Sequence, residues 1–371
     1  MLTPEENETL TRVGPGTPAG EMLRRYWWPV GFSQEIKAQD RPRRIQLLCE
    51  DLVLFRTGAG EVGVLDIRCS HRGTSLEFGR VEAGGLRCCY HGWLYDRDGN
   101  CLEQPAEPEG STFHERVRQP AYKVEELGGL IFAYLGPDPA SLLPRYDLLV
   151  RQDGARVVGA GEEYCNWLQR AENSVDQSHL TALHASVYPH LALKRPKLDW
   201  QKTWYGIRIE TQISGAGTPK ISHWLFPAHT RHTTARKGEK PDHALRFRVP
   251  TSDTKTTTFW VKFYPQDPPE LTTKGLKRRE PGVYNRIEDD WWGIASHEQD
   301  TVAQESQGPI FDRSREHLGA SDRGLIMMRE IMTDCIRDVK RGKDPVGVIR
   351  DPRQNEIITF DASMAEMDAL G

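Results

Sequence analysis

The stretch from residue 69 to residue 93 decides how the first part of the chain is interpreted. It begins Cys69-Ser-His71-Arg-Gly-Thr-Ser-Leu and ends Cys88-Cys-Tyr-His91-Gly-Trp93. Each end of the stretch carries a cysteine followed closely by a histidine, and residues 72–87 separate the two pairs. Thiolate and imidazole groups are both common metal ligands. The repeated pairing predicts a metal site at which two loops each supply one ligand of each kind.

This ligand set is the one that a Rieske [2Fe-2S] cluster requires, with cysteines on one iron and histidines on the other. Cys69, His71, Cys88 and His91 are therefore the predicted cluster ligands. Cys89 is an alternative to Cys88, but the Cys-x-x-His spacing from Cys88 to His91 lets a tight turn aim both side chains at one cluster edge. A structural zinc site is the other interpretation, although zinc modules usually pair Cys with Cys and His with His.

The residues around these loops have a β pattern. Apolar residues alternate with polar ones over much of residues 44–135, and residues 50–51 and 58–60 are predicted turns. Residues 136–151 are rich in proline and irregular, which is typical of a crossing between domains. We therefore expect an all-β domain with an N-terminal extension over residues 1–150.

Residues 151–371 mix both types of structure, which predicts an α+β domain that follows the all-β one. The apolar spacing indicates helices over 166–186 and 321–341 and antiparallel strands over 204–213, 223–226, 245–249 and 257–264. Residues 266–290 are charged and weakly apolar, so we expect a long surface loop there.

Composition excludes several classes of function. The chain has 371 residues, and 53 acidic residues nearly balance 49 basic ones, so no basic surface for nucleic acid is indicated. No apolar run approaches the length of a membrane span. The polar N-terminus does not resemble a secretory signal, and the 7 dispersed cysteines do not suit a disulfide framework. We expect a cytoplasmic protein.

A second group of possible ligands lies in the stretch Glu172-Asn-Ser-Val-Asp176-Gln-Ser-His179-Leu-Thr-Ala-Leu-His184. Two histidines and a carboxylate on one face of an iron form the facial triad of O₂-activating Fe(II) enzymes. Because His179 and His184 would point about 140° apart on a regular helix, either the helix ends between them or a π-bulge closes the gap. Asp176 would lie on nearly the same face as His179, where a carboxylate can orient the imidazole.

The motifs of both groups resemble those of Rieske oxygenases, and the resemblance covers nearly the whole chain. The segments Val13-Gly-Pro-Gly-Thr-Pro-Ala-Gly, Arg24-Arg-Tyr-Trp-Trp-Pro and Phe311-Asp-Arg-Ser-Arg-Glu-His-Leu-Gly are similar to those of the phthalate dioxygenase group, and within it to aryl O-demethylases. The resemblance implies a catalytic domain of the helix-grip (Bet v1/START-like) type. It also implies a homotrimeric oxygenase component that contains one [2Fe-2S] cluster and one mononuclear Fe(II) per chain.

The resemblance also implies roles for individual residues. Asp176 would connect the mononuclear iron to the cluster of a neighbouring subunit. The carboxylate ligand would come from Ser296-His-Glu-Gln-Asp300, with Asp300 the best match. Three other acidic residues compete with it: Glu298, Glu305 and Asp312. No Gly-x-Gly-x-x-Gly follows a predicted strand, so NAD(P)H and flavin are expected on a separate reductase, with or without a ferredoxin between the two.

The expected substrates are O₂ and an aromatic carboxylic acid, oxidised by O-demethylation of a methoxylated, lignin-derived biphenyl or vanillate-like acid. A carboxylate in an apolar pocket needs a cation, and arginine offers the better fork. Four basic residues are candidates: Lys194, Arg195, Arg246 and Arg248. Arg248 is favoured, since its strand lines the pocket in relatives. The alternatives are cis-dihydroxylation of a phthalate-like acid and, more remotely, a Rieske electron carrier without enzymatic activity.

Overall fold

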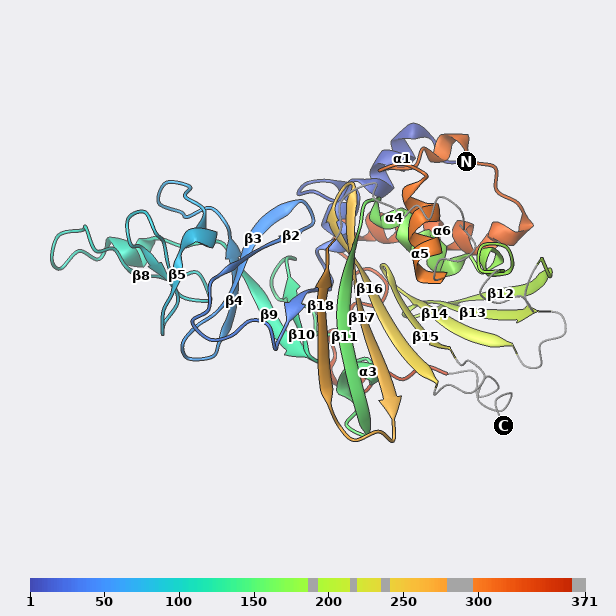
Figure 1. The fold of residues 1–371 in the computed structure, drawn as a ribbon. Coiled ribbons are helices and arrows are strands. Elements are labelled where there is room, and N and C mark those ends of the chain that lie inside the picture. The colour runs from blue at the N-terminus through green and yellow to red at the C-terminus, as the bar shows by residue number, and fades with distance from the viewer. Residues whose placement is uncertain (186–192, 214–218, 235–240, 279–295, 362–371) are drawn as a thin grey trace, which may run out of the picture.

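The computed structural model describes residues 1–185, 193–213, 219–234, 241–278 and 296–361, and it contains a β-rich first part and a larger mixed second part (Figure 1). The first part consists of α1 (Pro4–Thr11), α2 (Pro18–Leu23), β1 (Trp27–Phe32), β2 (Arg43–Leu47), β3 (Glu50–Arg56), β4 (Val62–Asp66), η1 (Leu76–Phe78), β5 (Arg80–Val81), β6 (Leu86–Arg87), β7 (Leu94–Tyr95), β8 (Cys101–Glu103), η2 (Phe113–Arg116), β9 (Ala121–Leu127) and β10 (Leu130–Tyr134). The second consists of α3 (Asp147–Val150), β11 (Gly154–Glu163), α4 (Trp167–Val175), η3 (Ser178–Thr181), β12 (Pro196–Thr203), β13 (Gly206–Ile213), β14 (Lys220–Leu225), β15 (His229–Thr234), β16 (Asp242–Ser252), β17 (Lys255–Pro265), β18 (Leu271–Lys277), α5 (Ser296–Glu305), η6 (Arg313–Arg315), η7 (Ala320–Asp322), α6 (Arg323–Lys340) and η8 (Pro352–Gln354).

The strands of the first part form a six-stranded sheet in the order β1-β10-β9-β4-β3-β2 and a small four-stranded sheet β5-β6-β7-β8. The hairpin between β2 and β3 turns at Leu48 and Cys49, whose φ angles are 52° and 64°. The predicted turn at residues 50–51 is therefore wrong, because the turn is two residues earlier. The reason is tertiary: Leu48 N and Cys49 N donate to Pro250 O and Thr251 O of β16, at 2.9 and 3.0 Å.

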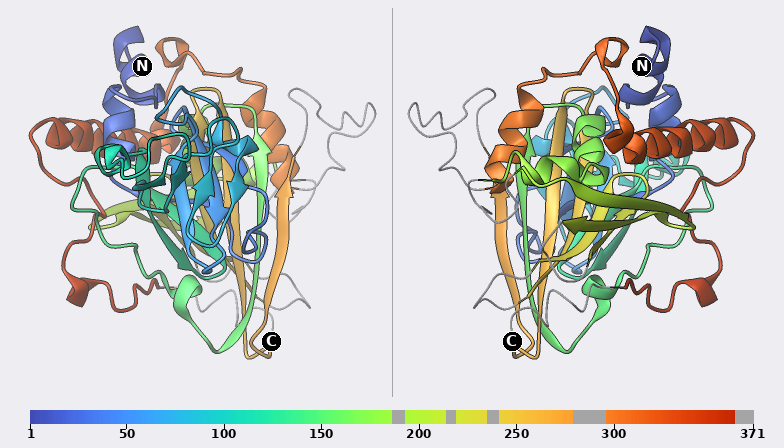
Figure 2. Two further views of the ribbon diagram at one scale, coloured as in Figure 1. Left: turned by 90° about the vertical axis from the view of Figure 1, so that its left-hand side faces the viewer. Right: turned by 90° about the vertical axis from the view of Figure 1, so that its right-hand side faces the viewer.

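The second part is built on an eight-stranded sheet in the order β12-β13-β14-β15-β16-β17-β11-β18. Helices α4, α5 and α6 gather at one side of this sheet (Figures 1 and 2), and α4 contacts β16 and β17. The predicted α+β class is confirmed. The sheet is not wholly antiparallel, since β18 pairs with β11 in parallel. The long loop predicted over 266–290 is wrong where β18 (271–277) forms, and residues 279–290 lie outside the described chain.

One large hydrophobic cluster joins both parts, from Leu10 to Ile358, with Trp28, Trp167 and Trp224 among its fully buried side chains. A smaller cluster lies under the four-stranded sheet. The division near residue 150 stays a prediction, because the large core crosses it. None of the helices in the described ranges is long and apolar enough to cross a membrane.

Candidate cluster loops and candidate metal centre

Two loops at the four-stranded sheet have the same backbone geometry. In each loop the cysteine N–H donates to the carbonyl five residues later, and the N–H four residues later donates to the cysteine carbonyl, at 2.8 to 3.1 Å. The fifth position of each loop needs a positive φ, and Gly73 (75°) and Gly92 (73°) provide it without strain. Cys69 and Cys88 therefore occupy equivalent positions, and the two loops present them as a matched pair.

The side chains of the two loops converge. The rings of His71 and His91 lie 4.4 Å apart between centroids, and Trp93 stacks on His71 at 4.2 Å. The Tyr95 hydroxyl lies 3.2 Å from Cys69 Sγ. Burial, followed by the nearby His91 and Arg72 charges, lowers the pKa of His71, so this ring is held neutral. A neutral imidazole is the form that binds a metal.

Several observations show that these residues fit a [2Fe-2S] cluster. The Nδ1 atom of His71 is buried and has no hydrogen-bond partner in the described chain, which is rare unless a ligand takes its place. Cys69 and Cys88 are each only 3% exposed, whereas Cys89 is exposed. Burial raises the pKa of the Cys69 thiol, and the hydrogen bond from Tyr95 opposes that rise. The donors suit a cluster, and Cys88 is better placed than Cys89.

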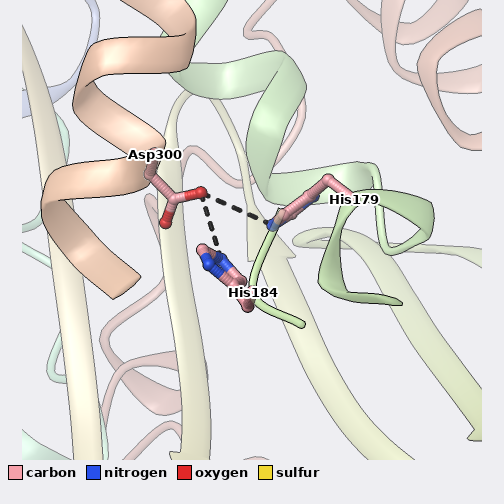
Figure 3. A group of neighbouring side chains, drawn as sticks. All are labelled: His179, His184 and Asp300. Carbon is pink, nitrogen blue, oxygen red and sulfur yellow. Dashed lines mark ion pairs between the residues drawn. The ribbon is translucent and has the colours of Figure 1, made fainter. Parts of the chain in front are cut away.

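The second group of predicted ligands comes together on the helix side of the large sheet (Figure 3). His179 Nε2 lies 3.6 Å and His184 Nε2 3.3 Å from Asp300 Oδ1. One ligand atom of each residue lies within 4.8 Å of the other two. Among the described residues, these three form the group of histidine and acidic side chains that could hold a metal ion. Burial raises the pKa of Asp300, but the hydrogen bond with His184 and the charge of His179 outweigh burial and hold it well below its usual range.

The outer nitrogens of the two histidines face oxygen atoms. His184 Nδ1 is 2.9 Å from Gln299 Oε1, and His179 Nδ1 is 3.5 Å from Asp176 Oδ2. At His184 the oxygen acceptor keeps the ring proton on Nδ1, which leaves the Nε2 lone pair for a metal; at His179 the Asp176 carboxylate faces Nδ1 at ion-pair distance. Burial raises the pKa of Asp176, but its hydrogen bond and charge interaction with His179 dominate, so its net pKa is lowered. The carboxylate is thus ionised beside the ring that it orients.

The chain between Asp176 and His184 is not one helix, which corrects the helix predicted over 166–186. Helix α4 ends at Val175, and His179 sits in the short turn η3. The reason is local: Asp176 has extended backbone, and its Oδ1 accepts from Ser178 N at 2.7 Å, a turn that competes with helix. The helix therefore ends before both histidines instead of between them, and no π-bulge is needed.

Helix α5, which carries Asp300, is held against α4 by polar contacts. Asn173 Nδ2 donates to Asp300 Oδ1 at 3.2 Å, and Gln169 Nε2 donates to Gln304 O at 2.9 Å. Arg170 bonds Gln304 and forms an ion pair with Glu163 at 2.8 Å. The two helices that position the ligands are thus fixed to each other.

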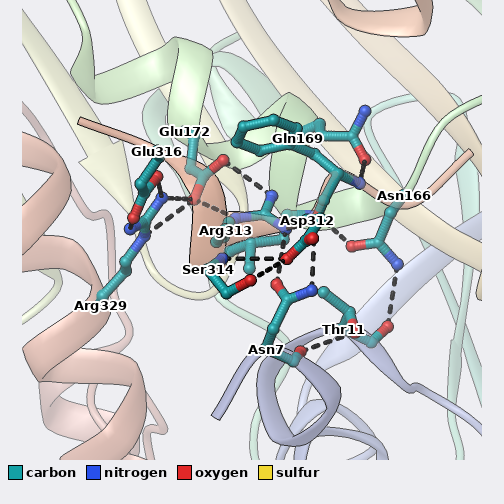
Figure 4. Close-up of polar contacts among 12 residues, drawn as sticks. Asn7, Thr11, Asn166, Gln169, Glu172, Asp312, Arg313, Ser314, Glu316 and Arg329 are labelled. Atoms are coloured by element: carbon teal, nitrogen blue, oxygen red, sulfur yellow. Dashed lines mark hydrogen bonds and ion pairs between the residues drawn. The ribbon is translucent and has the colours of Figure 1, made fainter. Parts of the chain in front are cut away.

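A buried ionic network anchors the other side of α4 (Figure 4). The two carboxylate oxygens of Glu172 accept hydrogen bonds from Arg313 at 2.7 and 2.8 Å, and Oε1 also accepts one from Arg329 Nε at 2.9 Å. Arg329 also binds Glu316, and Arg313 Nη1 donates to Asn7 Oδ1 at 3.1 Å. Burial raises the pKa of Glu172, but the two arginines outweigh it and the net pKa is lowered. The network ties α4 to α6, to the segment around η6 and to α1.

The competitors of Asp300 are engaged elsewhere. Glu298 faces Lys277 at 3.7 Å, and Glu305 Oε1 accepts from Tyr164 N at 2.8 Å. Asp312 caps the turn η6 by accepting from Ser314 N at 3.0 Å. The structure therefore brings only Asp300, of the acidic residues considered, to the two histidines.

The basic candidates for a substrate carboxylate differ in position. Arg248 is 5% exposed, its Nε donates to Ser174 Oγ of α4 at 3.1 Å, and its Nη1 has no partner in the described chain. Burial lowers the pKa of Arg248 to about 9. Lys194 and Arg195 are exposed, and Arg246 bonds His232 at 3.0 Å. Arg248 is therefore the candidate that contacts α4, the helix beside the candidate iron ligands, and that still has an unpaired donor within the described chain.

Sequence reasoning did not find two polar residues that contact the candidate iron ligands: Gln299, which bonds His184, and Asn173, which bonds Asp300. Gln299 directly precedes Asp300 and Asn173 directly follows Glu172 in the sequence, but no spacing pattern marks either residue.

Comparison with known proteins agrees with this geometry. A family model described as "Rieske [2Fe-2S] domain" matches residues 26–122, and one described as "LigXa C-terminal domain like" matches residues 287–368. The 5,5'-dehydrodivanillate O-demethylase oxygenase subunit of Sphingobium sp. (strain NBRC 103272 / SYK-6) is 38% identical, over 100% of this chain and 90% of that one. The phthalate 4,5-dioxygenase oxygenase subunit of Pseudomonas putida is 32% identical, over 99% and 93%.

The fold has solved counterparts as well. NdmA of Pseudomonas putida CBB5 superposes with a TM-score of 0.68 at 22% identity, over 87% of this chain and 94% of that one. Full-length relatives above 30% identity, together with the paired Cys–His loops, lead to one conclusion: the chain belongs to the Rieske non-heme iron oxygenases, as an oxygenase component of the phthalate dioxygenase-like group with a [2Fe-2S] domain.

Proposed function

We propose that this oxygenase component holds a mononuclear Fe(II) through His179, His184 and Asp300 and oxidises an aromatic carboxylic acid. The convergence of one ligand atom from each residue to within 4.8 Å carries the proposal. When bound, the cluster supplies single electrons and the iron activates O₂. The chain itself orients both imidazoles through Asp176 and Gln299 and keeps Asp300 ionised.

The proposed reaction is the O-demethylation of a methoxylated aromatic acid. The balance is ArOCH₃ + O₂ + 2 e⁻ + 2 H⁺ → ArOH + HCHO + H₂O, with both electrons coming from NAD(P)H. Arg248 is the proposed carboxylate partner, since its Nη1 is a buried donor without a partner in the described chain. A planar guanidinium can bind a carboxylate through two parallel hydrogen bonds. The relative named as a dehydrodivanillate O-demethylase subunit, identical at 38%, supports this reaction.

Cis-dihydroxylation of a phthalate-like acid is the second candidate. The phthalate 4,5-dioxygenase oxygenase subunit, aligned over 99% of this chain, favours it. Both reactions use the same ligands and the same carboxylate anchor, so they differ in which substrate carbon faces the iron. Their products differ clearly: demethylation releases formaldehyde, whereas dihydroxylation retains every substrate carbon in a cis-diol.

We further propose that electrons cross between subunits. The four-stranded sheet with the cluster loops lies at one end of the molecule, and the helices α4 and α5 with the candidate iron ligands lie well apart from it, in the second part of the chain (Figure 1). A homotrimer in which one chain's cluster approaches the next chain's Asp176 would shorten this path. A separate NAD(P)H-dependent flavin reductase, with or without a ferredoxin, would supply the electrons.

Metal analysis tests the proposal directly. Anaerobically purified protein should contain close to three irons per chain and, after dithionite reduction, a Rieske EPR signal of low average g. A monitored turnover with reductase, NADH and 3-methoxybenzoate should release formaldehyde. Two irons per chain without turnover would show an electron carrier in place of an oxygenase, and zinc without colour would overturn both metal assignments.

A further inference from the structure

The face of the large sheet that looks towards α4 has an unusual set of polar groups. Residues directly opposite each other in antiparallel strands share a face. The register pairs Ser222 with His232, Trp224 with Thr230 and Thr230 with Arg246, and Arg248 follows two residues after Arg246. Because Arg248 bonds Ser174 of α4, all of these side chains lie on the face that looks towards the candidate iron site.

Several buried polar atoms on this face have no hydrogen-bond partner within the described chain. They are Trp224 Nε1, Arg248 Nη1 and the hydroxyl oxygens of Thr211, Ser222 and Thr230. Thr211 shares the face because it lies two residues from Ile209, which pairs with Ser222. Buried polar groups in proteins are nearly always paired. A group of them on one face therefore indicates that a polar ligand, water or both occupy the space in front of the sheet.

Among the described strand residues, His232 is the histidine on this face, and its neighbour determines where its ring proton lies. Arg246 Nη1 lies 3.0 Å from His232 Nε2. A guanidinium only donates, so Nε2 accepts and the ring proton is on Nδ1. Burial, then the charges of Arg246 and Lys220, lower the pKa of His232 far below its usual value. The ring is thus a fixed neutral donor through Nδ1.

The register also places Lys220 and Thr211 on this face, because they pair with each other and lie two residues from the pair Ser222 and Ile209. The strand positions give the spacing of the polar groups. Along β16, Arg246 lies two residues before Arg248. Ala244, the cross-strand partner of His232, lies four residues before Arg248. At about 3.3 Å per residue, these positions are roughly 7 and 13 Å from Arg248.

We propose that His232, oriented by Arg246, is a specificity-determining residue that donates through Nδ1 to a second polar group of the substrate. This inference rests on the proposed function, in which the first group, a carboxylate, binds Arg248. The substrate class is then narrower than aromatic acids in general. It consists of elongated aromatic acids with a hydrogen-bond acceptor, such as a second carboxylate or a phenol oxygen, at the end remote from the first carboxylate.

A matched pair of probes tests this inference without turnover. Biphenyl-4-carboxylate and biphenyl-4,4'-dicarboxylate share one rigid two-ring frame and differ only in the second carboxylate. Their affinities are measured anaerobically by equilibrium dialysis against full-length, iron-loaded protein. We expect the dicarboxylate to bind at least about 10-fold more tightly, since a hydrogen bond to a charged group is worth that much.

Variants assign the preference to its residue. His232→Leu should reduce the affinity ratio to about 1 to 2 and leave the monocarboxylate within about 2-fold, whereas His232→Gln, which keeps a donor, should retain part of the preference. His317→Leu, at an exposed histidine, is the control and should change neither affinity. Cluster absorption and iron content show that each variant is folded and loaded.

The outcomes separate this inference from the proposed function. A ratio that survives in His232→Leu, or that is absent from the unmodified protein, overturns the role of His232 even if the monocarboxylate binds. Arg248→Met should weaken both probes; if it weakens neither, the carboxylate anchor of the proposed function is wrong. If neither probe binds the unmodified protein, both are overturned.

Discussion

Replacing Glu172 by glutamine tests whether the buried ionic network holds α4 in place. The side chain of Glu172 is 11% exposed and that of Arg313 is 0% exposed, and Arg329 shares the same carboxylate. Glutamine keeps the shape and one acceptor oxygen but removes the charge. Arg329 then keeps the carboxylate of Glu316, whereas Arg313 loses the carboxylate that it binds through two hydrogen bonds. Removing one partner of a buried ion pair costs about 3 to 5 kcal/mol.

Urea unfolding followed by tryptophan fluorescence measures this loss. With a slope of about 3 kcal/mol per M, the midpoint should fall by about 1 M or more. The matched control is Glu330→Gln, which breaks an exposed pair with Lys202 at 3.3 Å and should cost less than about 1 kcal/mol. Equal midpoints for the two variants would refute the reasoning, because the buried charges would then contribute no more than surface ones.

Other predictions follow from the same structure. The pKa of Glu172 is depressed in the folded chain, so its contribution to stability is present above its unfolded pKa and lost as pH falls through its folded pKa; the stability gap to Glu172→Gln should therefore narrow as the pH falls below the unfolded glutamate pKa of about 4.3. Cys88→Ser should abolish the cluster absorption, whereas Cys89→Ser should keep it; the reverse result would exchange the two assignments. Asp300→Ala should lower mononuclear iron, measured by metal analysis, by at least about 10-fold with the cluster intact, as expected when a ligand is lost; full iron loading would exclude Asp300 as a ligand. Asp176→Asn should retain both metals but slow single-turnover electron transfer from cluster to iron, and an unchanged rate would exclude the bridging role.

The sequence indicated which donor residues come together more accurately than it indicated the local backbone around them. The Cys–His pairs determine a donor set whose spacing also constrains the loops, and the structure shows those loops as near copies of each other. His179 and His184 were predicted as a pair, yet the helix over 166–186 was wrong. A single side-chain turn at Asp176 ends α4 early, and periodicity does not detect such a turn.

Long-range contacts explain the remaining differences. The residues at 50–51 are polar and turn-like, but contacts with Pro250 and Thr251 fix the turn at Leu48 and Cys49 instead. Strand β18 has little alternation of apolar and polar residues, so its sequence does not predict a strand. Its parallel hydrogen bonding to β11 holds it in the sheet instead. His232 is an ordinary strand residue until the register places it beside Arg246. These contacts join residues from several strands that are far apart in the sequence, so the pattern within one segment does not predict them.

The contact between the β2–β3 hairpin and β16 limits how freely the chain can be recombined with its relatives. Residues 48 and 49 bond the backbone of Pro250 and Thr251, only two and three residues beyond Arg248. An exchange of the first 150 residues for those of a homologue would thus replace a support of the strand that carries the proposed carboxylate anchor. Chimeras built to change electron supply should therefore keep this hairpin from the parent that provides β16, or substrate preference will change along with the redox partner.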